Sequence, residues 1–444
     1  MSEWTRQTLA EVADIRISNV DKKETEGQKS VRLCNYMDVY SNSYIERGME
    51  FMEATASQEE ITKFKVSKGD VLITKDSETP FDIGIPSVVV DEIQDLVCGY
   101  HLALIKPDQQ KVDSIFLSKI LASKASASYF SRLAAGSTRY GLSSGAIAET
   151  PLSIPGLVYQ KKVAGILETL DRAIEKIDSL VKKYRQIKIG LMHDLFTRGV
   201  GPDGKLRRSR EEAPELYQDT AVGCVPRDWE LKLLREMARP GVPHIKTGPF
   251  GSSLKGEHWV DEGVPVITIG ALGEGRFISE ELLHISDFYA SFLTDYRMKV
   301  GEVVFSRVAD VGRSVVIGEC QDGWVMSSNL MRLHLSEDVM DPKYLQESFA
   351  YDFRIKGQIR RKVNSGGRDV ANSEILNSIL FLCPPIEEQR QIVHASQAIS
   401  RKIELEQAQL GKLIKQKLGL MHDLLTAKAS IEVQPDARPK VAHV

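Results

Sequence analysis

The architecture follows from a duplicated segment, whose first copy reads QKKVAGILETLDRAIEKIDSLVKKYRQIKIGLMHDL at residues 160–195. The second copy reads QRQIVHASQAISRKIELEQAQLGKLIKQKLGLMHDL at residues 389–424, an offset of 229. Extended back to Pro155 and Pro384, the copies are identical at thirteen of 41 positions and share an unbroken GLMHDL. This period is far too long for a solenoid unit. It indicates that a whole domain was duplicated together with the helix that follows it.

Each copy has apolar residues at steps of three and four, which predicts a long helix with a narrow apolar seam. Prolines stand just before both copies, where proline fits a first helical turn. Such a seam requires a partner helix, and generic oligomerisation through a coiled coil is one possibility. Because two matching helices lie in one chain, we expect them to pair with each other as an antiparallel coiled coil. That pairing would place the preceding domains at opposite ends, with internal pseudo-two-fold symmetry.

The duplication extends upstream of the helices. Trp4, Leu9, Glu11 and Ala13 recur as Trp229, Leu234, Glu236 and Ala238, KGDVLITK at 68–75 lies over VGEVVFSR at 300–307, and Asp82 and Gly84 lie over Asp310 and Gly312. Short β-rich runs mixed with polar helical stretches predict an α+β fold, in which two tandem mixed α/β domains are separated by the two helices. The expected order is domain 1–154, helix 155–198, linker 199–221, domain 222–383, helix 384–427 and loose tail 428–444.

The composition is that of a folded protein, with 42% hydrophobic and 27% charged residues. The formal charge is -3, so a nucleic-acid-binding chain would have to concentrate its positive charge locally. The five cysteines are far apart and include no CxxC pair, which favours a reduced cytoplasm. Neither an export signal nor a membrane-spanning run is indicated.

Catalytic motifs are incomplete wherever they begin. GALGEGRF lacks the third glycine of a dinucleotide fingerprint, and Gly251 and Gly256 are followed by Glu257 and His258 instead of the Lys and Ser or Thr of a phosphate loop. The double proline in CPPI at 383–386 lacks the flanking residues with which an adenine methyltransferase grips its base. The repeated HD of GLMHDL fits a histidine in a last helical turn better than a metal site. We expect no cofactor or metal site in this chain.

Residues suited to contact DNA occur in parallel places in both halves. Arginine can read guanine with two hydrogen bonds, while hydroxyl groups and lysines hold phosphates. An ordinary exposed loop or turn would explain each of these residues equally well. The candidates are Lys75, Ser137, Thr138, Arg139 and Tyr140 in the first domain, and Lys246, Thr247, Ser252, Ser253, Lys255, Arg307, Arg360, Arg361, Lys362 and Arg368 in the second.

Four features together resemble the specificity subunits of type I restriction-modification systems. These are the alternation of domain and long helix, CPPIEEQRQIV at 383–393, TGPFGSSLK at 247–255, and TRGVGPDGKLRRSREEAPELY at 197–217 followed by VPRDWELKLL. The first half departs from the pattern, because no acidic residue precedes Gln160, and this bears on its contacts with partner subunits.

The resemblance implies two target recognition domains that read a bipartite DNA site across a non-specific spacer, without catalysis by this chain. It also implies two modification subunits that bring S-adenosylmethionine and methylate adenine, and restriction subunits that bring ATP-driven translocation and cleavage with magnesium. Two alternatives remain open. A stand-alone methyltransferase or nuclease would bind its own cofactor or metal, whereas a coiled-coil scaffold would show no preference for any DNA sequence.

Overall fold

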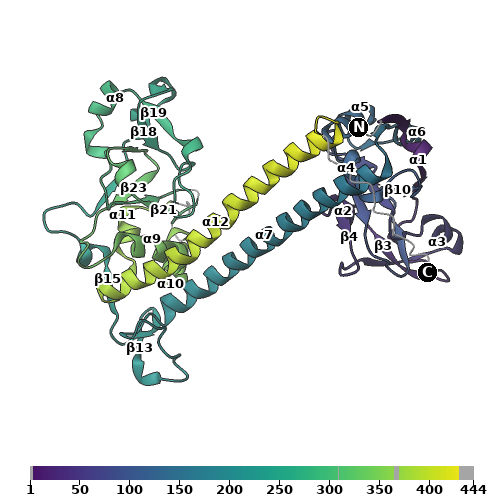
Figure 1. Cartoon of the computed structure of the whole chain (residues 1–444). Coiled ribbons are helices and arrows are strands. Elements are labelled where there is room, and N and C mark those ends of the chain that lie inside the picture. Colours follow the sequence, from purple (N-terminus) through teal and green to yellow (C-terminus); the bar gives the residue numbers. More distant parts are fainter. Residues whose placement is uncertain (1–3, 309, 365–369, 430–444) are drawn as a thin grey trace, which may run out of the picture. The chain divides into compact units, whose positions relative to one another are not determined.

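The computed structural model describes residues 4–308, 310–364 and 370–429. The chain forms two compact units, of which unit 1 comprises residues 1–179 and 407–444, and unit 2 comprises residues 180–406. Each unit holds a globular head of mixed α and β structure together with one half of each long helix (Figure 1). The two heads are named here head 1 (residues 4–154) and head 2 (residues 222–383).

The long helices are α7 (Leu157–Thr197) and α12 (Ile386–Leu425). Their halves pair in opposite directions in unit 1. The Tyr159 hydroxyl, near the start of α7, donates to the carbonyl of Ala429, just past the end of α12, at 3.1 Å. Further along α7, Asp171 lies 2.5 Å from Lys417, which precedes Ala429 in the chain. The predicted antiparallel pairing is therefore confirmed in this unit.

The same direction is found independently in unit 2. The backbone amide of Val200, just past the end of α7, donates to the carboxylate of Glu388 at 2.8 Å, near the start of α12. Lys402, further along α12, places its Nζ 5.8 Å from the ring centroid of Tyr184, which lies earlier in α7. The helix halves of unit 2 are thus antiparallel as well.

Head 1 contains a five-stranded sheet and a three-stranded sheet (Figure 1). In spatial order, the larger sheet consists of β2 (Ala13–Ile17), β10 (Leu102–Pro107), β6 (Val71–Thr74), β8 (Pro86–Val89) and β4 (Tyr44–Ile45). The smaller consists of β5 (Met52–Ala56), β3 (Lys29–Cys34) and β9 (Leu96–Cys98). On β6, Val71 and Ile73 enter the core shared with the helices, while Leu72 enters the core shared with the smaller sheet. Because side chains alternate along a strand, burial on both faces accounts for the continuous apolar run VLIT.

Head 2 repeats this plan with two four-stranded sheets. The first consists of β16 (Ile245–Thr247), β23 (Leu330–Leu333), β20 (Val303–Ser306) and β21 (Ser314–Val316). The second consists of β17 (Trp259–Val260), β19 (Leu283–Ile285), β18 (Val264–Ile267) and β22 (Val325–Met326). Val303 and Phe305 of β20 enter the core that includes residues of α7 and α12, whereas Val304 enters a separate core. The predicted match between 68–75 and 300–307 is confirmed, because β6 and β20 are the equivalent central strands.

A buried glutamine ties each long helix to its head. In unit 1, the Oε1 of Gln160 accepts the backbone amide of Asp113 at 2.8 Å, and its Nε2 donates to the carbonyls of Lys111 and Pro155. Asp113 is the N-cap of helix α4 (Ser114–Leu121), since its carboxylate accepts the amide of Phe116. The start of α7 is therefore fixed directly to the start of α4.

Unit 2 makes the same set of bonds. The Oε1 of Gln389 accepts the amide of Asp341 at 2.9 Å, and its Nε2 donates to the carbonyls of Val339 and Pro384. Asp341 is the N-cap of helix α9 (Pro342–Tyr351). The duplication seen in the sequence is thus preserved bond for bond where each helix meets its head.

The connection after α7 is a folded structure that packs on α12. Strands β13 (Tyr217–Thr220) and β14 (Gly223–Pro226) form a hairpin. The Arg207 guanidinium pairs with Glu388 and, at 2.6 Å, with Asp228.

None of the helices in the part of the chain that the structure describes has the length and apolar character of a membrane span. The expected loose tail lies almost wholly outside the described residues.

Candidate nucleic-acid interface

Lys75 of head 1 directly follows the central strand β6. Its backbone amide donates to the carbonyl of His101 at 3.0 Å, and its carbonyl accepts the amide of Leu142 at 2.8 Å. These bonds hold the backbone of Lys75 between two loops. They lie at the edge of the larger sheet where β6 ends. The side chain therefore emerges from a rigid position.

An ionic cluster surrounds the Lys75 side chain. Its Nζ lies 2.6 Å from Asp76 and 4.8 Å from the ring centroid of Tyr100. The same Asp76 oxygen lies 2.8 Å from the Nδ1 of His101. Lys75 was predicted as a DNA contact, whereas Asp76, Tyr100 and His101 were missed. The adjacent carboxylate in the sequence was the one signal that could have indicated this pairing.

Arg307 of head 2 occupies the equivalent backbone site after β20. Its amide donates to the carbonyl of Asn329 at 3.1 Å, and its carbonyl accepts the amide of Ala371 at 2.7 Å. Its Nε is buried and has no hydrogen-bond partner among the described residues. A buried donor without a partner is costly for stability. The two heads thus present different cations from the same place in the fold.

The predicted loop of head 1 lies beside Lys75. Residues 135–141 form a tight turn in which the backbones of Ala135 and Gly141 bond to each other. Gly136 has φ +147° and passes so close to the Arg139 carbonyl that a side chain would not fit. Strand β11 (Tyr140–Gly141) pairs with β7 (Asp76–Ser77), which follows Lys75. The structure therefore brings the loop candidates, of which Ser137, Thr138 and Arg139 are exposed and Tyr140 is half-buried, to the same edge.

The segment 246–255 of head 2 reaches the same edge as Arg307 at only one end. Gly248, directly after β16, donates its amide to the carbonyl of Leu330 and leaves no room for a side chain beside the Ser327 carbonyl. Lys246 instead pairs with Asp295 at 3.1 Å on the sheet. Lys255 is exposed beyond the 3-10 turn η3 (Gly251–Ser253), which contains the predicted Ser252 and Ser253, and Thr247 lies within β16.

The basic run of head 2 lies on α10 (Phe353–Asn364). Arg354 anchors this helix by donating to the carbonyls of Phe196 and Cys224. Arg360 is exposed, while Arg361 and Lys362 line a pocket of about 400 Å³ together with Ala221, Val222, Phe353 and Leu380. The structure thus groups this run with the connection after α7. Arg368 lies outside the described residues.

Aromatic and acidic groups at the edge of head 1 were not predicted as site residues. Tyr36 and Tyr40 stack with ring centroids 5.4 Å apart, and the Tyr40 hydroxyl donates to Asp82 at 2.7 Å. This hydrogen bond raises the pKa of Tyr40, so the hydroxyl stays protonated. Phe81 is 86% exposed, which is unusual for phenylalanine. No cluster of three or more potential metal ligands occurs within the part of the chain that the structure describes.

Residues 1–182 and 226–416 match the family model described as the type I restriction modification DNA specificity domain. The type I restriction enzyme MjaVIII specificity subunit of Methanocaldococcus jannaschii is 22% identical over 285 residues, which are 63% of this chain and 62% of that protein. The match therefore spans slightly less than two thirds of that relative. A protein of the same organism named as a type I restriction enzyme MjaX specificity subunit is 22% identical over 447 residues, covering 97% of this chain and 94% of that protein.

Two solved structures are similar over almost the whole chain. The S subunit of a type I restriction-modification system from M. genitalium has a TM-score of 0.59 at 15% identity, covering 95% of this chain and 96% of that one. A chain from a study of complex assembly in the type I R-M system has a TM-score of 0.51 at 14% identity, covering 95% and 97%. At these identities the likeness supports the fold alone.

Proposed function

This chain belongs to the type I restriction modification DNA specificity family, and from that premise we propose that its two heads read the two halves of a bipartite, asymmetric DNA target. The long helices would act as the spacer, so that the bases between the half-sites are not read. Each half-site would be contacted at the edge of the head's central sheet. Two heads with one plan and different side chains suit a target whose halves differ in sequence.

The observation that carries this proposal is the shared backbone site of Lys75 and Arg307. Both residues follow the central strand of a head, and both are held by a pair of backbone hydrogen bonds. The guanidinium of Arg307 is suited to binding, because such a group can read guanine by donating two hydrogen bonds in the major groove. In head 1, the Lys75 ammonium is a hydrogen-bond donor and the Asp76 carboxylate beside it is an acceptor. The two heads would therefore discriminate between different bases.

The remaining candidates fit a supporting role along the DNA backbone. Hydroxyl groups and exposed cations of loops commonly position a protein on phosphates. The exposed Ser137, Thr138 and Arg139 would do so for head 1, and Lys255 with Ser253 for head 2. Arg361 and Lys362, which line a pocket beside the connection after α7, are less suited to the same half-site.

We assign no reaction step to this chain. Methylation of adenine would be carried out by two modification subunits that bind S-adenosylmethionine. Restriction subunits would supply ATP-driven translocation and magnesium-dependent cleavage. The family and the names of the relatives support this division of labour, in which the present chain selects the DNA sequence.

Co-expression with a modification subunit tests the proposal. Methylated adenines would be mapped across the host genome, with the modification subunit expressed alone as the control. We expect methylation in one motif with two fixed half-sites and a spacer of constant length, dependent on this chain. Methylation without a consensus, or an unchanged pattern when this chain is omitted, would contradict the proposal. Binding of S-adenosylmethionine by the purified chain would favour a stand-alone methyltransferase instead.

A further inference from the structure

A buried charge cluster joins head 1 to both long helices. Asp171 of α7 lies 2.6 Å from Lys119 of α4 and 2.5 Å from Lys417 of α12. The side chains of Lys119 and Asp171 are each only 4% exposed. The Tyr44 hydroxyl of β4 also donates to Asp171, at 2.8 Å. One carboxylate therefore satisfies donors from three different elements of unit 1.

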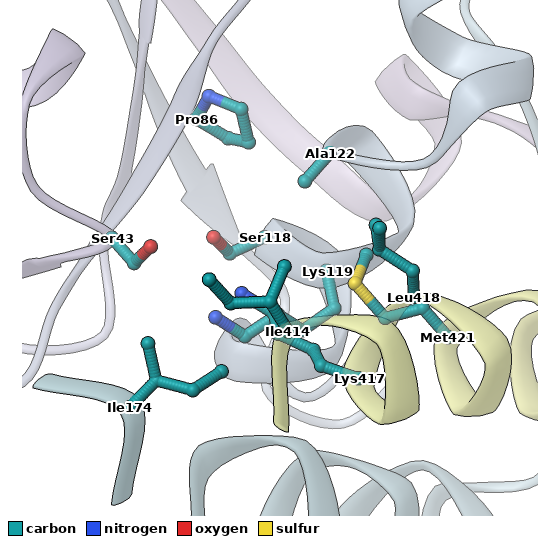
Figure 2. Close-up of a pocket in the computed structure, with 10 residues that line it drawn as sticks. All are labelled: Ser43, Pro86, Ser118, Lys119, Ala122, Ile174, Ile414, Lys417, Leu418 and Met421. Carbon is teal, nitrogen blue, oxygen red and sulfur yellow. The ribbon is translucent and has the colours of Figure 1, made fainter. Parts of the chain in front are cut away.

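The surroundings of this cluster explain why the acid is needed. Figure 2 shows Lys119 and Lys417 lining one pocket, which also includes Ile174 and Ile414 and has a volume of about 270 Å³. Burial lowers the pKa of Lys119, although Asp171 partly offsets this. Burial also disfavours the charge of Asp171, but the two ammonium groups outweigh that effect and lower its pKa. Without the carboxylate, two lysines would face each other in a poorly solvated place.

The duplication identifies the equivalent positions in unit 2. Lys119 and Glu347 each lie six residues beyond the N-cap aspartate of their helix, α4 and α9. Each N-cap is bonded to the equivalent glutamine, so these two positions correspond in the structure as well as in the sequence. Lysine in head 1 is thus replaced by glutamate in head 2.

The helix positions also differ between the units. Asp171 and Ser400 lie at the same distance beyond Gln160 and Gln389, and Lys417 and Lys188 are an identical pair within the duplicated segments. The acid therefore lies on the long helix in unit 1 and on the head in unit 2. A lysine from the antiparallel helix accompanies it in both.

Contacts in unit 2 agree with this exchange. Glu347 is buried, and burial raises its pKa to about 7, with Ser396 of α12 and Lys188 of α7 opposing the rise. Lys188 lies over the ring of Tyr351, one turn beyond Glu347 on α9, with its Nζ 4.9 Å from the centroid. The position equivalent to Asp171 is the neutral Ser400, whose hydroxyl donates to the Ser396 carbonyl at 2.9 Å.

We propose that these residues make each helix position selective for its own head, with Asp171 accepting a head that carries lysine and Ser400 accepting a head that carries glutamate. Head 1 placed on α12 would bury Lys119 against Ser400 and Lys188 without a carboxylate. Head 2 placed on α7 would bring Glu347 against Asp171. A copy of either head joined to the other helix would therefore meet unmatched charges. Asp171 and Glu347 act as positioning residues.

A double-mutant cycle in the full chain tests this matching. The variants are K119E, D171S and K119E/D171S, of which the double variant reproduces the charges of unit 2. K119E places a second carboxylate beside Asp171, and D171S leaves two lysines without a carboxylate. Each single change is expected to lower the midpoint of thermal unfolding by roughly 5 to 10 °C. The double variant should recover most of that loss. The proposal would be overturned if the midpoint of the double variant fell by the sum of the two single decreases. K415E, an exposed charge reversal on α12, is the control.

A head exchange gives a second readout that general destabilisation would not produce. In this chain, head 2 is replaced by a second copy of head 1, either with Ser400 retained or with S400D. We expect the exchanged protein to be soluble only with S400D. Only then should the backbone amides of α4 in the second copy be protected from hydrogen exchange. Q397D, which adds the same charge at an exposed position of α12, should not rescue it. Equal folding with and without S400D would refute the selectivity, and neither readout depends on DNA binding.

Discussion

The indole nitrogen of Trp229 donates a hydrogen bond to the carboxylate of Glu388 at 3.1 Å. The same carboxylate pairs with Arg207 and accepts the amide of Val200. It therefore joins the connection after α7, the start of head 2 and the start of α12. In unit 1 the equivalent position is Tyr159, whose hydroxyl instead bonds to the Ala429 carbonyl.

Loss of the Glu388 carboxylate should destabilise unit 2. E388A leaves Arg207 and two further donors without their acceptor, and removal of one partner from a buried ion pair costs about 3 to 5 kcal/mol. Chemical denaturation would measure the free energy of unfolding. E387A removes an exposed neighbour that pairs with Arg390, and it should cost no more than about 1 kcal/mol. Equal effects of the two changes would show that Glu388 does not hold the connection.

Replacement of the buried glutamines should loosen the junction between head and helix. Q389L leaves the amide of Asp341 without an acceptor and two carbonyls without a donor, which we expect to cost about 2 to 4 kcal/mol. Hydrogen exchange at the start of α9 should accelerate more than exchange in the sheets. Q391L, at an exposed position of the same helix, is the matched control. A uniform loss of protection throughout unit 2 would argue against this local role.

The sequence predicted the features that recur with fixed spacing. The offset of 229 aligned Gln160 with Gln389, and the structure confirms that both make the same bonds. The alignment of KGDVLITK with VGEVVFSR likewise placed Lys75 and Arg307 at one backbone site. These predictions succeeded because a duplicated segment keeps its local hydrogen bonds even after most side chains have changed.

The features that the sequence did not predict depend on partners distant in the chain. The buried face of α4 follows from its apolar residues, but the partner of Lys119 is Asp171, far along the chain. The run at 360–362 lies on α10, whose start is fixed by the bonds of Arg354 to the carbonyls of Phe196 and Cys224. Nothing in the sequence near the run predicts these distant partners.

The stability of unit 2 should depend on pH through Glu347. Its pKa is raised by burial from 4.5 to about 7, so the folded state binds a proton that the unfolded state has released. The contribution of Glu347 to the free energy of unfolding is therefore largest below the unfolded pKa, and it should fall by on the order of 2 kcal/mol as the pH rises from about 4.5 to about 7. The groups that bear on this carboxyl are Lys188 on α7, Ser396 on α12, Lys343 on α9 and Asp341 at the N-cap of α9.

Denaturation of the wild-type chain and E347Q between about pH 5 and about pH 8 would measure this dependence. The amide cannot ionise, so the variant should lose the decline between these values. It should also be the more stable protein at the upper end of the range. Parallel curves for the two proteins would show that Glu347 does not carry the dependence.

Substitution of Arg307 should change recognition in one half-site only. R307A removes a guanidinium whose Nε has no hydrogen-bond partner within the described structure. We expect the preference for the correct base over other bases at one base pair to fall by about tenfold or more. R307K keeps the charge but loses the paired donors, so it should retain DNA affinity better than discrimination. K75A should instead alter the other half-site.

Methylation maps of complexes that contain each variant would provide the measurement. K205A, which removes an exposed lysine outside both heads, controls for loss of positive charge. Relaxation of both half-sites by a single variant would mean that the residue acts on overall affinity, because a base contact confined to one head cannot alter the bases read by the other. An unchanged motif with R307A would remove Arg307 from the set of base-reading residues.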